Sequence, residues 1–119
     1  MLKKSFFSEL DLSNNRISVL PGEMTNCAQL ERIDISFNSF VTLPPVLAEM
    51  PSLVEINARR HYVAELDLEA MVAGLCSLES LNLEENPVNK NTYEELERLT
   101  KVRVLLSPRN TEEWEDLSI

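Results

Sequence analysis

The sequence predicts a right-handed α/β solenoid, in which a parallel concave sheet of about five strands carries short 3₁₀ or α-helices on its convex side. Three observations lead to this expectation. The chain repeats itself with a period of about two dozen residues. Apolar and polar residues alternate at the start of each repeat, and an asparagine or a substitute follows at a constant distance. The 119 residues, of which 44% are hydrophobic, suffice for one domain with a core.

Four segments carry the repeat: FSELDLSNNRISVLP from Phe7, LERIDISFNSFVTLP from Leu30, LVEINARRHYVAEL from Leu53 and LESLNLEENPV from Leu78. Their starts lie 23, 23 and 25 residues apart. In each segment apolar residues occupy the first, fourth, sixth and eleventh positions. This alternation has the period of a half-buried strand, and the stacking of successive coils buries the apolar faces.

The ninth position of each repeat marks the point where the chain leaves the strand. It holds Asn15, Asn38, His61 and Asn86. A buried asparagine there satisfies backbone groups of the turn, so successive coils form a ladder of hydrogen bonds. His61 can donate a hydrogen bond from one ring nitrogen and accept one at the other. This favours a structural role, as a degenerate substitute for the ladder asparagine, over a metal-binding or proton-transfer role. In the same repeat Ala58 leaves less core volume than a leucine, and we expect Tyr62 or a shifted backbone to fill the space.

The second halves of the repeats predict the convex side. LPGEMTNCAQL and LPPVLAEMPSL begin near prolines and predict short 3₁₀ or single-turn helices. LDLEAMVAGLCSL predicts a fuller α-helix capped by Asp67. Thr92 is expected to cap a further helix, with Glu94 and Glu95 in its first turn.

We divide the chain into an N-terminal extension at 1–6, a repeat domain at 7–107 and an acidic C-terminal tail at 108–119. The repeat domain comprises 7–29, 30–52, 53–77, 78–98 and a cap strand at 99–107. In this cap strand Ser107 stands where the asparagine would be. A terminal coil needs such a cap because a bare end would expose the core.

The two ends of the chain differ in this respect. Nothing resembling a cap precedes Phe6 and Phe7, so we expect an edge that dimerisation, the segment MLKK or further sequence would cover. In the tail, Thr111 is expected to cap a short helix from which Trp114 and Leu117 fold back.

The pattern L-x-x-L-x-L-x-x-N-x-L resembles the leucine-rich repeat, in the short typical class found in intracellular eukaryotic proteins, and covers 7–107. The segment NPVNKNTYEELERLTKVRVLL resembles the terminal cap of the family that contains the U2 small nuclear ribonucleoprotein A-prime protein and the phosphatase-1 regulatory subunit. MLKK, LERIDIS, SLESLNLEENPVN and LLSP are similar to the family of leucine-rich repeat-containing protein 20. These resemblances imply a binding scaffold and carry over no catalytic residue.

Charge and composition exclude several classes of function. Eleven basic residues face 20 acidic ones, for a net charge of −9, which argues against binding nucleic acid or an anionic membrane. No apolar run is long enough for a membrane span or a secretory signal. Cys27 and Cys76, expected in the core and nearer the surface, indicate a reducing compartment, so we expect an intracellular, cytoplasmic protein with the nucleus as the alternative. Without a phosphate loop, a nucleophile–base pair or a metal constellation, we expect no cofactor, no metal and no catalysis.

Side chains at the third, fifth and seventh positions are expected on the concave face. The residues predicted to bind a protein partner are Asp11, Arg32, Asp34, Asn57, Arg59, Asn82, Glu84, Lys101 and Arg103. Acidic residues predominate toward the N-terminus and basic ones toward the C-terminus, which would orient a partner. The alternative is a solvated face whose charges pair across strands. We expect Arg59 to project into the concave face between the carboxylates of Asp34 and Glu84, and we favour it over His61 as a functional residue. A second hypothesis is a structural or adaptor subunit that forms a homodimer or a complex through its N-terminal edge.

Overall fold

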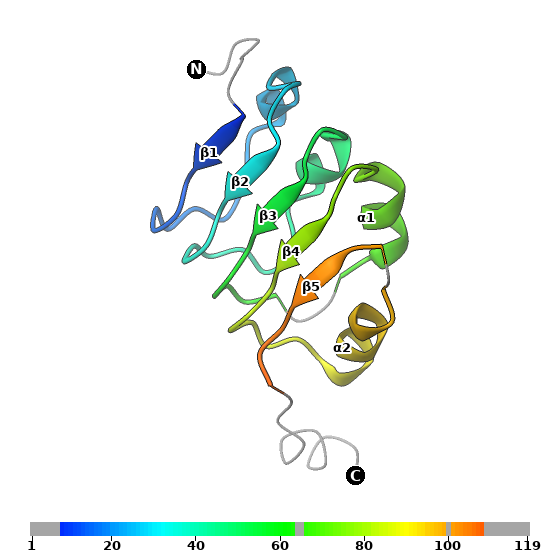
Figure 1. Cartoon of the computed structure of the whole chain (residues 1–119). Helices are drawn as coiled ribbons and strands as arrows, with labels where there is room; N and C mark the ends of the chain where they lie inside the picture. Colours follow the sequence, from blue (N-terminus) through cyan, green and yellow to red (C-terminus); the bar gives the residue numbers. More distant parts are fainter. Residues whose placement is uncertain (1–7, 64–65, 100, 109–119) are drawn as a thin grey trace.

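The computed structural model describes residues 8–63, 66–99 and 101–108 (Figure 1). The predicted edge at Phe6 and Phe7 and the predicted tail helix after Thr111 lie outside these residues.

Five short strands form one parallel sheet whose spatial order equals the chain order. They are β1 (Glu9–Asp11), β2 (Arg32–Asp34), β3 (Glu55–Asn57), β4 (Ser80–Asn82) and β5 (Arg103–Leu105). The first four strands pair without a shift in repeat position, so Leu10 lies beside Ile33 and Ile56 beside Leu81. The predicted register of the cap strand is wrong by two residues, because the fourth-position Leu81 pairs with Val104, which a count from Leu99 makes the sixth position. Each coil therefore advances the chain by one strand, and the predicted fold class is confirmed.

Four short helices return the chain from one strand to the next, on the side opposite the concave face (Figure 1). They are the 3₁₀ helices η1 (Gly22–Asn26) and η2 (Pro45–Glu49) and the α-helices α1 (Leu68–Gly74) and α2 (Lys90–Glu97). The predicted sequence of 3₁₀ and α segments is confirmed. Asp67 caps α1 as predicted, since its Oδ1 accepts a hydrogen bond from the Ala70 N–H over 3.2 Å. None of the helices in the described chain is long and apolar enough to cross a membrane.

The predicted start of α2 is wrong. The N-cap is Asn89, whose Oδ1 accepts a hydrogen bond from the Thr92 N–H over 2.9 Å. Thr92 lies inside the helix and is buried, so Glu94 and Glu95 fall beyond the first turn. Both asparagine and threonine make good caps, and the earlier start allows the helix to bury Thr92 together with Leu96.

The core lies between the sheet and the helices and continues from coil to coil. Its sixth-position members Ile35, Ala58 and Leu83 are almost completely buried. Leu12, their counterpart in the first coil, is only half-buried because β1 is the outermost strand of the described sheet. Tyr62 is 64% exposed, so the expectation that it fills the space beside Ala58 is wrong.

The two cysteines lie where they were expected. Cys27 is buried in the core, Cys76 is exposed, and both are free thiols.

On the convex side, the backbones of α1 and η2 approach each other closely at Gly74. α1 packs against η2, and a Cβ atom built on Gly74 would lie 2.0 Å from the carbonyl oxygen of Ala48. Only glycine fits at this contact, because any other residue would force the two helices apart.

Candidate functional site

The concave face carries two in-register rows of side chains, one from each outward position of the strands. The third-position row is Glu9, Arg32, Glu55, Ser80 and Arg103, and the fifth-position row is Asp11, Asp34, Asn57, Asn82 and Leu105. Neighbouring strands lie about 4.8 Å apart, so side chains of one row reach one another. The structure thereby brings most of the predicted partner-binding residues onto one surface. Arg59 and Glu84 follow the strands, and Lys101 precedes β5.

The fifth-position row also has a structural role that the sequence analysis did not assign. Each Asp or Asn accepts, through Oδ1, a hydrogen bond from the backbone N–H two residues later. The pairs are Asp11 with Ser13, Asp34 with Ser36, Asn57 with Arg59 and Asn82 with Glu84, over 2.9 to 3.1 Å. These Asx turns end the strands at equal positions.

The two acidic members of the row make an additional contact. The hydroxyl groups of Ser13 and Ser36 donate to the Oδ1 atoms of Asp11 and Asp34 over 2.6 Å. The hydroxyl and the backbone N–H of Ser13 together lower the pKa of Asp11 below its usual 3.8, because both stabilise the carboxylate. Asp11 is therefore negative at neutral pH.

The charges of the concave face are partly paired and partly free to act on a partner. Arg32 Nε lies 3.5 Å from Glu55 Oε2, in a pair whose side chains are about half exposed and therefore weakly stabilising. Beyond it, Asp11 and Asp34 leave an excess of negative charge near β1. Arg103 and Lys101 leave an excess of positive charge near β5, and both side chains are exposed.

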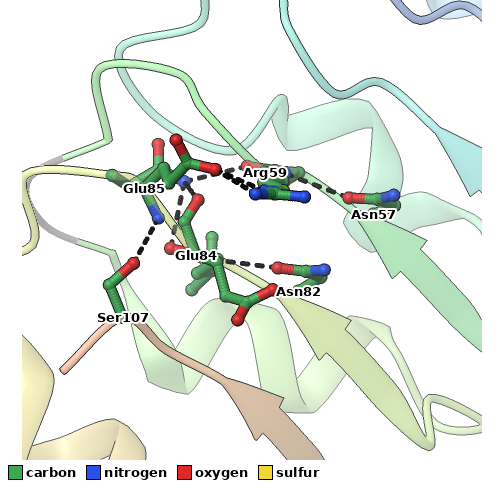
Figure 2. Close-up of polar contacts among 9 residues, drawn as sticks. Asn57, Arg59, Asn82, Glu84, Glu85 and Ser107 are labelled. Carbon is green, nitrogen blue, oxygen red and sulfur yellow. Dashed lines mark hydrogen bonds and ion pairs between the residues drawn. The ribbon is translucent and has the colours of Figure 1, made fainter.

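Arg59 does not lie where the sequence predicted. Its guanidinium binds Glu85, with Nε donating to Glu85 Oε2 over 2.6 Å and Nη2 contacting the same oxygen (Figure 2). The expected position between Asp34 and Glu84 is therefore wrong. Glu85 is the eighth residue of the next repeat, so this ion pair joins the third and fourth coils.

The ninth-position residues form the predicted kind of hydrogen-bond network. The Nδ2 group of Asn38 donates to the carbonyl groups of Leu12, Ile35 and Ser36, and its Oδ1 accepts from the N–H groups of Asn15 and Ile17. Asn86 repeats the pattern with Ala58, Leu83, Glu84, His61 and Val63. Asn15, in the first coil, is exposed, and among the described residues its Nδ2 group donates to the Leu12 carbonyl alone. The prediction that Ser107 takes the place of the asparagine in the last coil is wrong. With Leu81 paired to Val104, Ser107 is the counterpart of Glu84, and its Oγ accepts a hydrogen bond from the Glu85 N–H over 2.7 Å.

His61 supports less of this network than the asparagines do. Its Nδ1 accepts a hydrogen bond from the Phe40 N–H over 3.3 Å, and its buried Nε2 has no partner among the described residues. Burial lowers the pKa of His61 below 6.5, against the opposing effects of the Ile35 and Asn38 backbone and of the Asp34 carboxylate. The imidazole is therefore neutral at pH 7, as expected for a group that costs free energy to charge in the core.

A set of residues missed at the sequence level lies at the eighth position. Asn14, Phe37, Arg60 and Glu85 all have φ between 58 and 60°, in the left-handed region. This conformation turns their side chains outward along the edge where the strands end. The available signal was an apolar Phe37 between the buried Ile35 and the ladder residue Asn38, in a position that serves no core function.

Nothing in the described chain has the arrangement of a metal centre. Among residues 8–63, 66–99 and 101–108, no group of three or more His, Cys, Asp or Glu side chains could hold a metal ion.

Comparison with known proteins agrees with this geometry. Residues 7–27 and 29–50 match the family model described as Leucine Rich Repeat. Adenylate cyclase of Schizosaccharomyces pombe is 24% identical over 104 residues, which cover 87% of this chain and 6% of that protein. Leucine-rich repeat serine/threonine-protein kinase 1 of Mus musculus is 33% identical over 85 residues, which cover 66% of this chain and 4% of the kinase.

A solved structure is similar as well. A leucine-rich repeat protein of Leptospira interrogans matches with a TM-score of 0.70 at 28% identity, covering 82% of this chain and 24% of that one. The chain therefore spans a small part of each of these proteins. The registered repeats, the stacked parallel strands and these similarities together show that the chain has the leucine-rich repeat fold.

Proposed function

We propose that this chain is a non-catalytic module that binds a protein partner on its concave face. Leucine-rich repeat domains typically serve protein interactions, and solenoids present such extended surfaces to their partners. One observation supports the choice of surface. The exposed rows of the sheet carry uncompensated negative charge at Asp11 and Asp34 and positive charge at Arg103, on strands held in fixed register.

A partner with the opposite polarity would be oriented by these charges before close contact forms. The paired Arg32 and Glu55 in the middle of the row would contribute less, since exposed ion pairs are weak and partly satisfied. Arg59 is a poorer candidate than the sequence suggested, because Glu85 already holds its guanidinium.

The test is capture of partners by the immobilised full chain, followed by mass spectrometry, with charge variants compared in parallel. The double variant Lys101→Glu with Arg103→Glu should lose the captured protein. Asp11→Asn with Asp34→Asn should weaken capture without disturbing the turns, because asparagine performs the same Oδ1 role at Asn57 and Asn82.

A matched control carries the same change in net charge on the convex side. Lys90→Glu with Arg98→Glu changes exposed side chains at the two ends of α2 (Figure 1). It should capture the partner as the unmodified chain does. Equal capture by all variants would contradict the concave-face proposal.

A second candidate is a structural or adaptor subunit that assembles through its N-terminal edge. In the described sheet, no strand lies beside β1 on its outer side, and Leu10 and Leu12 are only half-buried. Unpaired strand edges are a common route to association. Light scattering distinguishes a monomer from a homodimer. A measured mass of 13.6 kDa at every protein concentration would contradict a homodimer that forms through this edge.

Two finer predictions accompany this proposal. We expect an intracellular location, with the cytoplasm favoured and the nucleus as the alternative, because cysteine usage fits a reducing compartment. The closer resemblance to the family of leucine-rich repeat-containing protein 20, and that of the cap to the U2 A-prime and phosphatase-1 regulatory proteins, remain predictions from the residues quoted above.

A further inference from the structure

The edge of the sheet where the strands end carries an exposed cluster of aromatic and basic side chains. We name it the edge patch, and it consists of Arg16, Phe37, Arg60 and Tyr62. These residues come from the loops that follow β1, β2 and β3, and they line a shallow hollow of about 830 Å³. Asn38, His61 and Asn86 of the ladder also line the hollow, as do Asn14, Glu85 and Pro87.

The aromatic residues of the edge patch are unusually exposed for their size. Tyr62 is 64% exposed and Phe37 is 37% exposed. The Arg60 guanidinium carbon lies 5.4 Å from the centroid of the Phe37 ring, a cation–π contact that holds both groups at the surface. Aromatic and arginine side chains are the residue types that dominate binding energy at protein interfaces.

The two arginines of the edge patch have no carboxylate partner in the described chain. The ion pairs between described residues join Arg32 to Glu55 and Arg59 to Glu85, and neither pair involves Arg16 or Arg60. Arg16 and Arg60 are exposed without such a pair, in a chain of 20 acidic and 11 basic residues. An acidic protein that leaves two arginines of one hollow without an ion pair presents there a local surface of opposite sign to its overall charge.

Backbone conformation adds an independent observation. Arg16, Phe37 and Arg60 have φ of 56, 58 and 59°, a region that bulky side chains rarely adopt. Hydrogen bonds to the next coil hold two of them, from the Phe37 N–H to Arg59 O over 3.0 Å and from the Arg60 N–H to Glu84 O over 2.9 Å. Asn14 shows the residue type that fits this conformation well, so the aromatic and basic residues stand where folding alone favours asparagine or glycine.

We propose that the edge patch binds an acidic peptide segment of a partner protein, one that carries an aromatic or large aliphatic side chain among its carboxylates. The carboxylates would pair with Arg16 and Arg60, which have no ion pair with another described residue. The apolar side chain would enter the hollow against Phe37 and Tyr62. This surface is distinct from the concave rows and does not rest on the function proposed for them.

The test uses the full-length chain and an array of short synthetic peptides. The peptides place several glutamates around one tryptophan or leucine, and a matched set replaces each glutamate by glutamine. The chain should bind the acidic set and not the glutamine set, with Kd values read by fluorescence anisotropy for the strongest binders. Equal binding to both sets would overturn the proposal, since carboxylate recognition would then be absent. The proposal would also be overturned if neither set bound.

Three variants locate the contact. Arg16→Glu with Arg60→Glu should weaken binding by about tenfold or more, because it reverses both charges. Phe37→Asn should weaken binding also, while asparagine suits the left-handed backbone and keeps the fold intact. Lys90→Glu with Arg98→Glu, which changes the net charge equally on the convex side, should bind as the unmodified chain.

Three further results test the assignment of peptide binding to the edge patch. Equal weakening by the α2 control would show a general charge effect and overturn the assignment to this surface. Lys101→Glu with Arg103→Glu should leave peptide binding unchanged, so failure of the concave-face proposal is distinguishable from failure of this one. Binding of a single-stranded oligonucleotide in place of the peptides, lost in the Arg16→Glu, Arg60→Glu chain, would assign the patch to phosphate and overturn the peptide proposal.

Discussion

The Nδ1 atom of His61 accepts a hydrogen bond from the backbone N–H of Phe40, and the two aromatic rings lie 5.2 Å apart at 57°. This relationship replaces the fuller set of bonds that an asparagine makes at the same position of the neighbouring coils. Asn38 and Asn86 each bond to backbone groups of their own turn and of the preceding coil. At this position the third coil is therefore held by fewer hydrogen bonds than the coils on either side of it.

Replacing His61 by asparagine should stabilise the fold. The His61→Asn side chain can donate to backbone carbonyl groups of its own turn, as Asn38 and Asn86 do, and it removes the unpartnered Nε2. Each net hydrogen bond contributes about 1 kcal/mol. Loss of the ring contact with Phe40 offsets part of the gain, so we expect an increase in the free energy of unfolding on the order of 1 kcal/mol at pH 7. Urea unfolding measures it. A decrease would show that the Phe40 contact outweighs the restored hydrogen bonds.

The stability of the chain should depend on the protonation of His61. Burial lowers the pKa of His61 in the folded state below its ordinary value of 6.5, so the unfolded chain binds a proton first as the pH falls. The free energy of unfolding should therefore decrease as the pH falls below 6.5, until the lowered folded-state pKa is reached. The His61→Asn chain serves as control, and a pH profile identical to that of the unmodified chain would contradict the assignment.

Gly74 should not tolerate a side chain. In Gly74→Ala the new Cβ would lie 2.0 Å from the Ala48 carbonyl oxygen, so α1 and η2 must separate. We expect the free energy of unfolding to fall by about 1–3 kcal/mol, the usual range for forced overpacking.

Gly22→Ala is the matched control for Gly74→Ala. Nothing lies within 4 Å of a Cβ at Gly22, and neither glycine has a positive φ. This substitution should stabilise by about 0.4–1 kcal/mol through the unfolded chain, which is opposite in sign. Similar effects of the two substitutions on thermal unfolding would show that the close approach is absent.

Substitutions of Asp34 should separate the contribution of its negative charge to stability from that of its hydrogen bonds in the turn. Asp34→Ala removes the acceptor for the N–H and the hydroxyl of the buried Ser36, which should cost about 1–3 kcal/mol. Asp34→Asn keeps an Oδ1 acceptor, as Asn57 does in the next coil, and should change stability much less. Chemical denaturation of both variants measures the difference. If both lose equal stability, the carboxylate charge matters and the turn geometry does not.

Exposed ion pairs should matter little for folding. Arg59 and Glu85 are both more than one third exposed, so Arg59→Ala should change the free energy of unfolding by less than about 1 kcal/mol. A larger loss in denaturant unfolding would indicate that the pair holds the third and fourth coils together.

The repeat pattern contains enough information to predict the sheet, the order of the strands and the identity of the core. Apolar spacing decides which side of a strand is buried, and the 23-residue spacing of the first three repeats aligns Ile33 beside Ile56. The same local signals located the 3₁₀ segments and the Asp67 cap. They misplaced the start of α2, because Asn89 and Thr92 both satisfy the capping pattern and only burial of Thr92 decides between them.

Contacts between coils required the tertiary structure. Arg59 and Glu85 are separated by 26 residues in the chain, and the choice of Glu85 over Glu84 depends on which way each side chain points where its strand ends. The left-handed backbone at Phe37 and Arg60 turns both side chains to the edge, and no hydrophobic period encodes that direction.

What the sequence by itself determined was thus the interior, because burial follows a period that each segment carries within itself. What only the tertiary structure decided was the surface: the Asx turns of the concave row, the partner of Arg59 and the outward set of the edge patch. These depend on backbone dihedral angles and on neighbours one coil away, which become defined only when the coils stack.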